Sequence, residues 1–579
     1  MRPRVFTGLL ASLLLPSTVA GQAAVEGRHG MVIGTTGAPA VRAGLEVLRE
    51  GGSAVDAALT TSLTQIALAA GAWVSYAGFM TLVHYDAATG RVEAMNAGFN
   101  TVKNETDPLT IPPMGTPSGR TALVPGYMAG VEAAHRKFGR LPFARLFAPA
   151  IQVAEGGVPV DRMLGSMIAM RRDVLARLPE TKRVFTNQNG EFYKEGDRLV
   201  QADVAATLRK VATQGASYFY RGPWGEKLVA LVQREGGKMT MEDLAAYRVI
   251  WSEPVHTRVR DLDVYATGLP NVGGMTTLEA LNLIEAAELR KQPHYSRSAA
   301  SLYALMKITR ASTVFSPPAM GGAPSELVSQ YFPGLNVQPG FMLASDGARA
   351  AWTALSGPGW RALDSALRVR NAGESSEVVE GILKSVRRPP EHSDAVVAID
   401  SAGNMVALVH TINTVTWGTT GIFVDGVSIP DPATFQQAAI KAVGPGNRVP
   451  EQTNPLLILR NGKPYFASSS IGSGLFQATV QSLHNVLDFG MDPQPAVDTA
   501  QFLKNEWLPK ESHIITVGPG AFRQSLLDSV QAMGQPIREV PLAGQGLLRG
   551  YWVGIRRDPA TGFLRGGRST TLNGSIEAY

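Results

Sequence analysis

Near Pro390 the sequence changes character, and this change limits the folds open to the chain more than any other feature. Before it, apolar residues recur at the three- and four-residue spacing of helices, as Val41, Leu45 and Leu48 do. After it, short apolar runs such as "AVVAID" and "NMVALVHTI" alternate with turn residues, a pattern typical of β-strands. We therefore expect a helix-rich part, a strand-rich part and a boundary of some kind near residue 390.

The composition is that of a globular chain. It has 579 residues, 45% of them hydrophobic, so it can bury a large core as one big domain or as two to four ordinary ones. It contains no cysteine. Disulfides, thiol nucleophiles and zinc-thiolate sites are therefore excluded together.

The first residues have the layout of a secretory signal peptide. Arg2 and Arg4 precede an apolar stretch, Val5 to Leu15, which Pro16 ends before a run of small residues. The stretch is well short of the roughly 20 residues that a membrane-spanning helix needs, and no later run is long enough either. We expect residues 1–23 to be removed and the protein to be exported to the periplasm or beyond, with no membrane span.

Charge and motifs exclude several further classes of function. The net charge of +6 is scattered, without a basic stripe that interleaves aromatic residues, so we expect no nucleic-acid partner. The nine histidines show no metal-ligand spacing such as HExxH, and no phosphate-binding loop is present. We expect neither a metal nor a cofactor.

Local patterns predict several elements of the helix-rich part. A strand at Met31 to Gly34 should lead into a helix from about Pro39, and Ser53 should cap a second, almost wholly apolar helix. Further helices are expected in 124–160, 241–247 and 275–289. The stretch from Pro317 to Ser356 is rich in Pro, Gly and Ser, so we expect a long surface excursion there.

A predicted hairpin brings two hydroxyl groups together. The turn signal "SAGN", Ser401 to Asn404, joins two apolar strands, so residues directly opposed across an antiparallel pair have numbers that sum to about 805. The numbers of Ser393 and Thr411 sum to 804. Another strand ends in the glycine-rich "SSSIGSGLF", from Ser468, where a backbone can approach a ligand closely and aim N–H groups at it.

At this point the chain resembles the gamma-glutamyltransferase family of N-terminal-nucleophile hydrolases, nearly from end to end. Six blocks in family order carry the resemblance: "AGLEVLREGGSAVDAAL", "VPGYMAGVEAAHRKFGRLPFARLFAPAI", "GGMTTLEALNLIE", "DSAGNMVALVHTINT", "PLLILRNGKPYFASSSIGSG" and "NVLDFGMDPQPAVDTAQF". The resemblance implies an α+β fold, a four-layer αββα sandwich. It also implies one precursor that cleaves itself into two chains, which remain together as a heterodimer.

The resemblance also assigns catalytic roles. Ser393 falls on the family's catalytic threonine, so cleavage between His392 and Ser393 would give a large chain, 24–392, and a small chain, 393–579. The freed α-amine of Ser393 can act as the base for its own hydroxyl. Thr411 matches the family's second hydroxyl, and the backbone N–H groups of Gly472 and Ser473 match its oxyanion donors.

The substrate pocket departs from the family pattern. Gly98 stands where the family has an arginine for the substrate α-carboxylate, and Glu451 and Gln452 stand where it has paired serines. The family residues that hold the α-amino group fall around Val427 and Pro430. Asn413 alone survives from that set. A carboxylate buried without its arginine is unfavourable, so we expect a small-molecule amide whose acyl group is not standard gamma-glutamyl.

Other interpretations stay open at this stage. Ser393 alone could be a strand-capping serine, and Thr411 an ordinary strand residue. His392, Ser393 and Asp394 do not form a triad, because adjacent residues of an extended chain point to opposite faces. The chain could also be a gamma-glutamyltransferase with a rearranged pocket, or an uncleaved homologue that only binds. The acyl group, the balance of hydrolysis and transfer, and the oligomeric state are not defined by the sequence.

Overall fold

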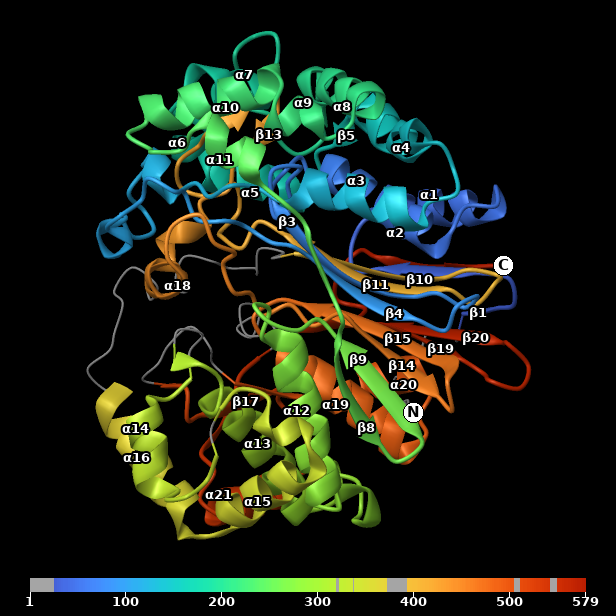
Figure 1. Cartoon of the computed structure of the whole chain (residues 1–579), viewed down its shortest axis with the longest axis vertical. Helices are drawn as coiled ribbons and strands as arrows, with labels where there is room; N and C mark the ends of the chain where they lie inside the picture. Colours follow the sequence, from blue (N-terminus) through green and yellow to red (C-terminus); the bar gives the residue numbers. More distant parts are fainter. Residues whose placement is uncertain (1–24, 319–321, 337, 372–392, 505–510, 542–548) are drawn as a thin grey trace, which may run out of the picture.

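The computed structural model describes residues 25–318, 322–336, 338–371, 393–504, 511–541 and 549–579. Figure 1 shows two β-sheets stacked in the middle of the molecule, with helices covering the outer face of each. The predicted four-layer αββα sandwich is confirmed. The predicted signal peptide and His392 lie outside the described residues.

Each of the two large sheets has seven strands within the described residues, and every pairing in them is antiparallel. In spatial order, the first sheet contains β1 (Glu26–Gly27), β20 (Leu564–Arg568), β19 (Tyr551–Arg557), β15 (Lys463–Ile471), β14 (Leu456–Arg460), β9 (Leu262–Ala266) and β8 (Val255–Val259). The second contains β21 (Ser575–Ala578), β2 (Met31–Gly34), β10 (Asp394–Ile399), β11 (Met405–Thr411), β3 (Phe79–Tyr85), β4 (Val92–Ala97) and β7 (Ile250–Ser252).

Helices from the first half of the chain cover the second sheet (Figure 1). They are α1 (Ala38–Arg49), α2 (Ala54–Leu68), α3 (Tyr127–Phe138), α4 (Phe143–Gly156), α5 (Arg162–Met170), α6 (Arg172–Ala176), α7 (Pro179–Phe185), α8 (Ala202–Gln214), α9 (Ser217–Tyr220), α10 (Pro223–Arg234) and α11 (Met241–Ala246). Two small ribbons lie among them, β5 (Val158–Pro159) with β6 (Arg198–Leu199) and β12 (Phe423–Val424) with β13 (Val427–Ser428).

The helices that cover the first sheet come from both sides of residue 390. They are α12 (Gly273–Ala286), α13 (Ala299–Val314), α14 (Ser325–Tyr331), α15 (Ser345–Ser356), α16 (Pro358–Asn371), α19 (Leu475–Phe489), α20 (Pro493–Asp498) and α21 (Gln524–Ala532). A small sheet, β16 (Phe502–Lys504), β17 (Ile515–Val517) and β18 (Ile537–Glu539), lies in this layer. Helix α18 (Gln437–Val443) lies apart from both layers, beside the 3₁₀ helix η1 (Pro108–Thr110).

Alternation along β10 contributes side chains to two apolar cores. In β10, Val396 and Ala398 pack against the helices of the second sheet, while Ala395 and Val397 pack between the two sheets. Successive side chains of a strand point to opposite faces, so both faces of β10 are buried. This burial explains why "AVVAI" is apolar throughout rather than alternating.

The β10–β11 hairpin has the predicted register. Asp394 lies opposite His410 and Ile399 opposite Met405, so paired residue numbers sum to 804. The Asp400 carboxylate accepts from the backbone N–H groups of Ala402 and Asn404. The turn also needs a residue that tolerates positive φ, and Gly403 supplies it with φ 87°.

Most elements predicted from local patterns are confirmed. The strand at Met31 to Gly34 is β2, and the helix expected from Pro39 is α1, which buries Val41, Leu45 and Leu48. Ser53 caps α2 in a reciprocal capping box with Asp56. Helices α3, α4, α11 and α12 occupy the other predicted ranges.

Helices predominate before residue 390 and strands after it, as expected, but the change does not divide the sheets, because β3, β4, β8 and β9 precede it and belong to the same sheets as later strands. One expectation is wrong. The stretch from Pro317 to Ser356 is not a surface excursion. It contains α14 and α15, and α15 packs on α12 with Ala348, Ala351 and Leu355 buried.

Candidate active site

Two hydroxyl groups meet at the end of the β10–β11 hairpin. Ser393 directly precedes β10 and Thr411 ends β11, and the Ser393 hydroxyl donates to Thr411 Oγ1 at 2.8 Å. Thr411 Oγ1 also accepts from the backbone N–H of Asn413 at 3.1 Å. The expectation that the hairpin brings these two hydroxyl groups together is confirmed.

Asp394 anchors the start of β10 on the opposite face from Ser393. Its buried carboxylate accepts from the hydroxyls of Thr35 and Thr36 at 3.0 and 2.6 Å, and from Trp73 Nε1 at 3.1 Å. Burial raises the pKa of Asp394 to about 7, and the three hydrogen bonds oppose that rise. Asp394, the first residue of β10, is thus hydrogen-bonded to the connection between β2 and α1 and to the segment that follows α2.

A cavity of about 630 Å³ opens beside the two hydroxyls. All four predicted catalytic residues line it: Ser393, Thr411, Gly472 and Ser473. The three predicted substrate-binding residues also line it: Asn413, Glu451 and Gln452. The fold therefore brings together every predicted site residue that the structure describes.

Glycine is required at position 472. Its φ of 85° lies in the left-handed region, and a Cβ there would come within 2.4 Å of the Arg549 carbonyl oxygen. A side chain at this position would therefore collide with that carbonyl group. The glycine in "IGSG" is thus needed for the close backbone approach that the sequence suggested.

Glu451 is a buried acid in the cavity wall. Asn413 Nδ2 donates to its Oε2 at 2.9 Å, and Gln436 Nε2 reaches its Oε1 at 3.4 Å. Burial raises the pKa of Glu451 to about 8, because these two amides and the charge of Arg448 compensate only part of the lost hydration. Glu451 is therefore mostly protonated, and so uncharged, at neutral pH.

The arginine beside Gly98 is Arg448, and its guanidinium is engaged by other residues rather than turned to the cavity. A Cβ there would lie 3.0 Å from Cδ of Arg448, so the stem of Arg448 fills that space. The Arg448 guanidinium donates to the carbonyl of Asn96 and to the side chain of Asn100, and it lies 4.9 Å from the ring centre of Tyr247. Arg448 is buried and is not among the residues that line the cavity.

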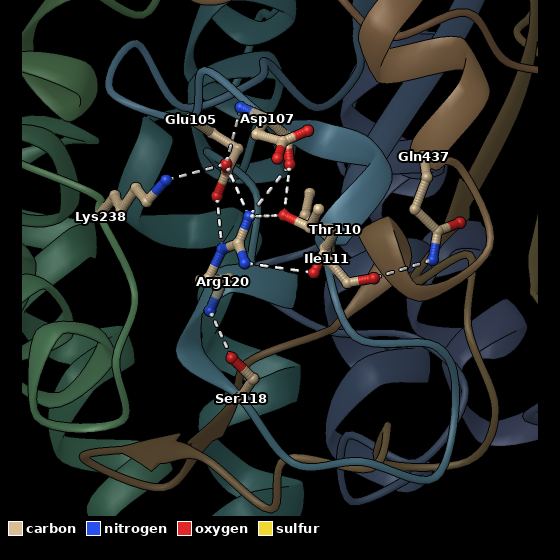
Figure 2. A network of polar contacts seen from close by, with 8 residues as sticks. All are labelled: Glu105, Asp107, Thr110, Ile111, Ser118, Arg120, Lys238 and Gln437. Carbon is tan, nitrogen blue, oxygen red and sulfur yellow. Dashed lines mark hydrogen bonds and ion pairs between the residues drawn. The ribbon is translucent and has the colours of Figure 1, made fainter.

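Arg120 is also occupied elsewhere. Figure 2 shows its guanidinium forming two hydrogen bonds of 2.8 Å with the Glu105 carboxylate, while Lys238 approaches the same carboxylate at 3.0 Å. Arg120 further donates to the backbone and hydroxyl of Thr110. Neither Arg120 nor the positions Val427 and Pro430 belong to the described cavity lining.

The described ranges contain no group of three or more His, Asp or Glu side chains that could hold a metal ion. In the same part of the chain, every helix is too short or too polar to cross a lipid bilayer.

Comparison with known proteins identifies the family. The family model for gamma-glutamyltranspeptidase matches residues 40–315 and 371–569. The chain belongs to the gamma-glutamyltranspeptidase family. The predicted family and the assignment of the protein as an enzyme are confirmed.

Individual relatives are distant but cover most of this gamma-glutamyltranspeptidase homologue. The glutathione hydrolase proenzyme of Escherichia coli (strain K12) is 26% identical over 537 residues, 89% of this chain and 86% of that protein. The acylase ACY 1 proenzyme of Pseudomonas sp. (strain SE83) is 26% identical over 503 residues, 82% of each chain. The crystal structure of cephalosporin acylase from Bacillus halodurans superposes with a TM-score of 0.76 at 21% identity, covers 99% of both chains and shows the shared fold.

Sequence reasoning missed two groups of residues at this site. Arg310 and Arg368 line the cavity together with Asp364, and Asp394 anchors the strand start. The arginines come from separate helices with no motif around them, so no spacing pattern could have joined them. The sequence analysis considered Asp394 only in the argument against a triad. An acidic residue inside an apolar strand is itself a sign of a structural or functional role, because charged side chains are seldom buried without partners.

Proposed function

We propose that the protein is a self-processing amide hydrolase or acyltransferase that works through an acyl-enzyme on Ser393. The observation that carries this proposal is the 2.8 Å hydrogen bond from Ser393 to Thr411 at the edge of a cavity lined by Gly472 and Ser473. A hydroxyl oriented by a second hydroxyl, beside backbone N–H groups that can stabilise an oxyanion, is an arrangement suited to nucleophilic catalysis.

Self-processing uses the same hydroxyl. Ser393 Oγ attacks the carbonyl carbon of His392, the peptide C–N bond breaks, and the Ser393 nitrogen takes the proton to become a free amine. Water then hydrolyses the ester, which releases His392 as a carboxylate and restores the hydroxyl. The similarity to proenzymes, the glutathione hydrolase and acylase relatives, supports this step.

The catalytic cycle repeats this chemistry on the substrate. The Ser393 α-amine takes the hydroxyl proton while Oγ attacks the substrate carbonyl, and the N–H groups of Gly472 and Ser473 stabilise the oxyanion. The C–N bond breaks, the proton passes to the leaving amine, and an ester remains on Oγ. Water releases an acid, or a second amine releases a new amide.

The acyl group should be uncharged where it meets Glu451. Zwitterionic recognition needs a cation for the carboxylate and an anion for the ammonium, since bare charges are costly to bury. Arg448 and Arg120 are both held elsewhere, and a protonated Glu451 offers an O–H donor rather than an anion. The similarity to an acylase proenzyme supports amide hydrolysis as the activity.

Steady-state kinetics test the proposed substrate class. We expect gamma-glutamyl-p-nitroanilide and glutathione to react with kcat/KM about a hundredfold or more below the usual 10⁴–10⁸ M⁻¹s⁻¹. Uncharged acyl-p-nitroanilides should react better. Ordinary efficiency on the glutamyl compound would instead identify a gamma-glutamyltransferase with a rearranged pocket. A single band on a denaturing gel, without activity, would identify a non-catalytic homologue.

We also propose that residues 1–23 direct export and are then removed. The sequence pattern of two arginines, an apolar run and small residues supports this step. N-terminal sequencing of the large chain from periplasmic extract tests it. A chain that still begins at Met1 and stays in the cytoplasmic fraction would exclude export.

A further inference from the structure

Self-cleavage before Ser393 would leave the nucleophile as the first residue of its chain. Chain ends fray unless other contacts hold them. The pairing of β10 with β11 begins at Asp394 and its pairing with β2 begins at Val396, so Ser393 lies just beyond the last paired residue. A hydroxyl that must stay 2.8 Å from Thr411 Oγ1 therefore stands outside the paired part of the strand.

The side chain of Asp394 holds this end from the opposite face of the strand. Its carboxylate is fully buried and accepts from the hydroxyls of Thr35 and Thr36 at 3.0 and 2.6 Å, and from Trp73 Nε1 at 3.1 Å. The two threonines lie between β2 and α1, and Trp73 follows α2. We call these four residues the terminal lock. After the proposed cut, its three donors belong to the large chain and Asp394 belongs to the small chain.

Thr35 also fixes the backbone of the next residue. Its Oγ1 accepts from the Ala395 N–H at 2.9 Å, and its own N–H donates to the Ala395 carbonyl at 3.1 Å. The large chain thus sets the positions of both Asp394 and Ala395. Any movement of the cut end is then confined to Ser393 itself.

A buried carboxylate is an unfavourable way to hold a strand end if stability alone is at stake. Burial raises the pKa of Asp394 to about 7, and the hydrogen bonds from Thr36, Thr35 and Trp73 oppose that rise. A buried charge adds little to stability compared with an apolar side chain of similar size. It does add direction, because a carboxylate that accepts from three fixed donors is held in one orientation. The terminal lock therefore suits positioning better than stability.

The terminal lock does not contact the substrate cavity. Asp394, Thr35, Thr36 and Trp73 are absent from the described lining of the cavity, whereas Ser393 belongs to it. Any effect of the lock on catalysis must therefore pass through Ser393. Such an effect should be the same for every acyl group, because the groups that meet the acyl chain lie elsewhere.

We propose that Asp394 is a positioning residue, which fastens the cut end of the small chain to the large chain and so holds the Ser393 hydroxyl against Thr411. This inference rests on the proposed function, because the end to be held exists only after self-cleavage. A misplacement of about 1 Å can cost a hundredfold in rate, so a fraying Ser393 would be a poor nucleophile. The register places the strand, and the terminal lock places its first residue.

Kinetics of the processed protein test this proposal. Thr36→Val removes the shortest hydrogen bond to Asp394 and keeps the shape of the side chain, and Asp394→Asn replaces one acceptor oxygen by a donor. Well below the melting temperature, each should lower kcat/KM by about tenfold or more, by the same factor for butyryl- and hexanoyl-p-nitroanilide. Thr36→Ser keeps the hydroxyl and should restore most of the activity. Thr60→Val is the matched control, because Thr60 on α2 is also buried and its hydroxyl has no hydrogen-bond partner among the described residues.

Aminopeptidase trimming tests the same chain end without requiring turnover. An aminopeptidase needs a free, extended end, so fraying sets the rate of trimming. On native, processed protein, a broad-specificity aminopeptidase should remove Ser393 several-fold faster from Thr36→Val and Asp394→Asn than from wild type or Thr60→Val. The mass of the small chain measures this removal.

The outcomes separate the lock from the proposed function. Wild-type kcat/KM in both lock variants, with only a lower melting temperature, would overturn the proposal and leave Asp394 a structural role. Equal trimming of all the proteins would also overturn it. If wild type is cut but cleaves neither anilide, the proposed substrate class fails, and faster trimming of the lock variants still supports the lock. An uncut wild-type chain would refute the proposed function and the lock together, because no chain end would exist to be held.

Discussion

The hairpin end that carries Ser393 and the cavity wall around Glu451 are built in different ways. At the hairpin, the backbone register places Ser393 opposite Thr411. Any sequence that keeps the strands and the turn therefore keeps these two positions side by side. At the wall, recognition depends on individual side chains, and exchanging them does not disturb a strand. Under the proposed function, this difference explains how the two hydroxyl positions stay fixed while the group that is recognised changes.

Among the variants that test this comparison, the one that removes the Thr411 hydroxyl should have the largest effect, a loss of kcat. Thr411→Val keeps the size and β-branching of the side chain but removes the acceptor for Ser393, so we expect kcat to fall by about a hundredfold to a thousandfold. Thr411→Ser keeps the hydroxyl and should retain most activity. Steady-state kinetics on the best uncharged anilide measure both. A Thr411→Val enzyme with normal kcat would show that the register places the hydroxyls together without catalytic use.

The charge state of Glu451 should appear in the pH dependence of stability. Its pKa is about 8 in the folded protein against 4.5 ordinarily, so the folded state holds a proton that the unfolded chain has lost between these values. The contribution of Glu451 to the free energy of unfolding therefore falls as pH rises through this window, by on the order of 4 kcal/mol. Glu451→Gln should remove this dependence, so its free energy of unfolding relative to wild type should rise from pH 4.5 to 8.

Denaturant unfolding at several pH values measures this difference. Glu253→Gln is the control, because Glu253 is exposed and its replacement should leave the wild-type pH dependence unchanged. If Glu451→Gln stays parallel to wild type across the window, Glu451 is ionised in the folded protein. The account of an uncharged acyl side would then lose its main support.

Replacing Arg120 should have the smallest effect on substrate preference. Arg120→Met breaks the paired hydrogen bonds with Glu105, which is buried and keeps only Lys238 as a cationic partner. We expect a loss of about 1–3 kcal/mol in the free energy of unfolding. The ratio of kcat/KM between glutamyl and uncharged anilides should stay within about twofold of wild type. A selective loss of glutamyl activity would show that Arg120 reaches the substrate.

The sequence predicts the hairpin well because its geometry follows from local rules. A turn at "SAGN" fixes which residue numbers oppose one another, and the buried strands on either side admit one register. The capped helix after Ser53 is predictable for the same reason, since its capping box involves neighbours in the chain. Local signals thus placed two of the residues that matter most, Ser393 and Thr411.

The parts that the sequence did not predict depend on distant contacts. Helix α15 is buried through Ala348, Ala351 and Leu355, and small alanines give little apolar periodicity until α12 is known to cover them. The cluster of Arg310, Asp364 and Arg368 joins α13 to α16, and Arg310 lies more than fifty residues before Asp364, so only the fold brings these charges together. The neutral state of Glu451 likewise follows from burial that the sequence alone does not reveal.

The central claim is that Ser393 cuts the chain and then carries the acyl group, and the N-terminal sequence and mass of the small chain test it most directly. Wild-type protein should yield a fragment that begins Ser-Asp-Ala-Val, and brief reaction with an uncharged acyl-p-nitroanilide should add the mass of that acyl group to this fragment. Ser393→Ala should remain one chain, while Ser393→Thr should still be cut. If Ser393→Ala is cleaved at the same bond, or if the added mass lies on another residue, the account is wrong.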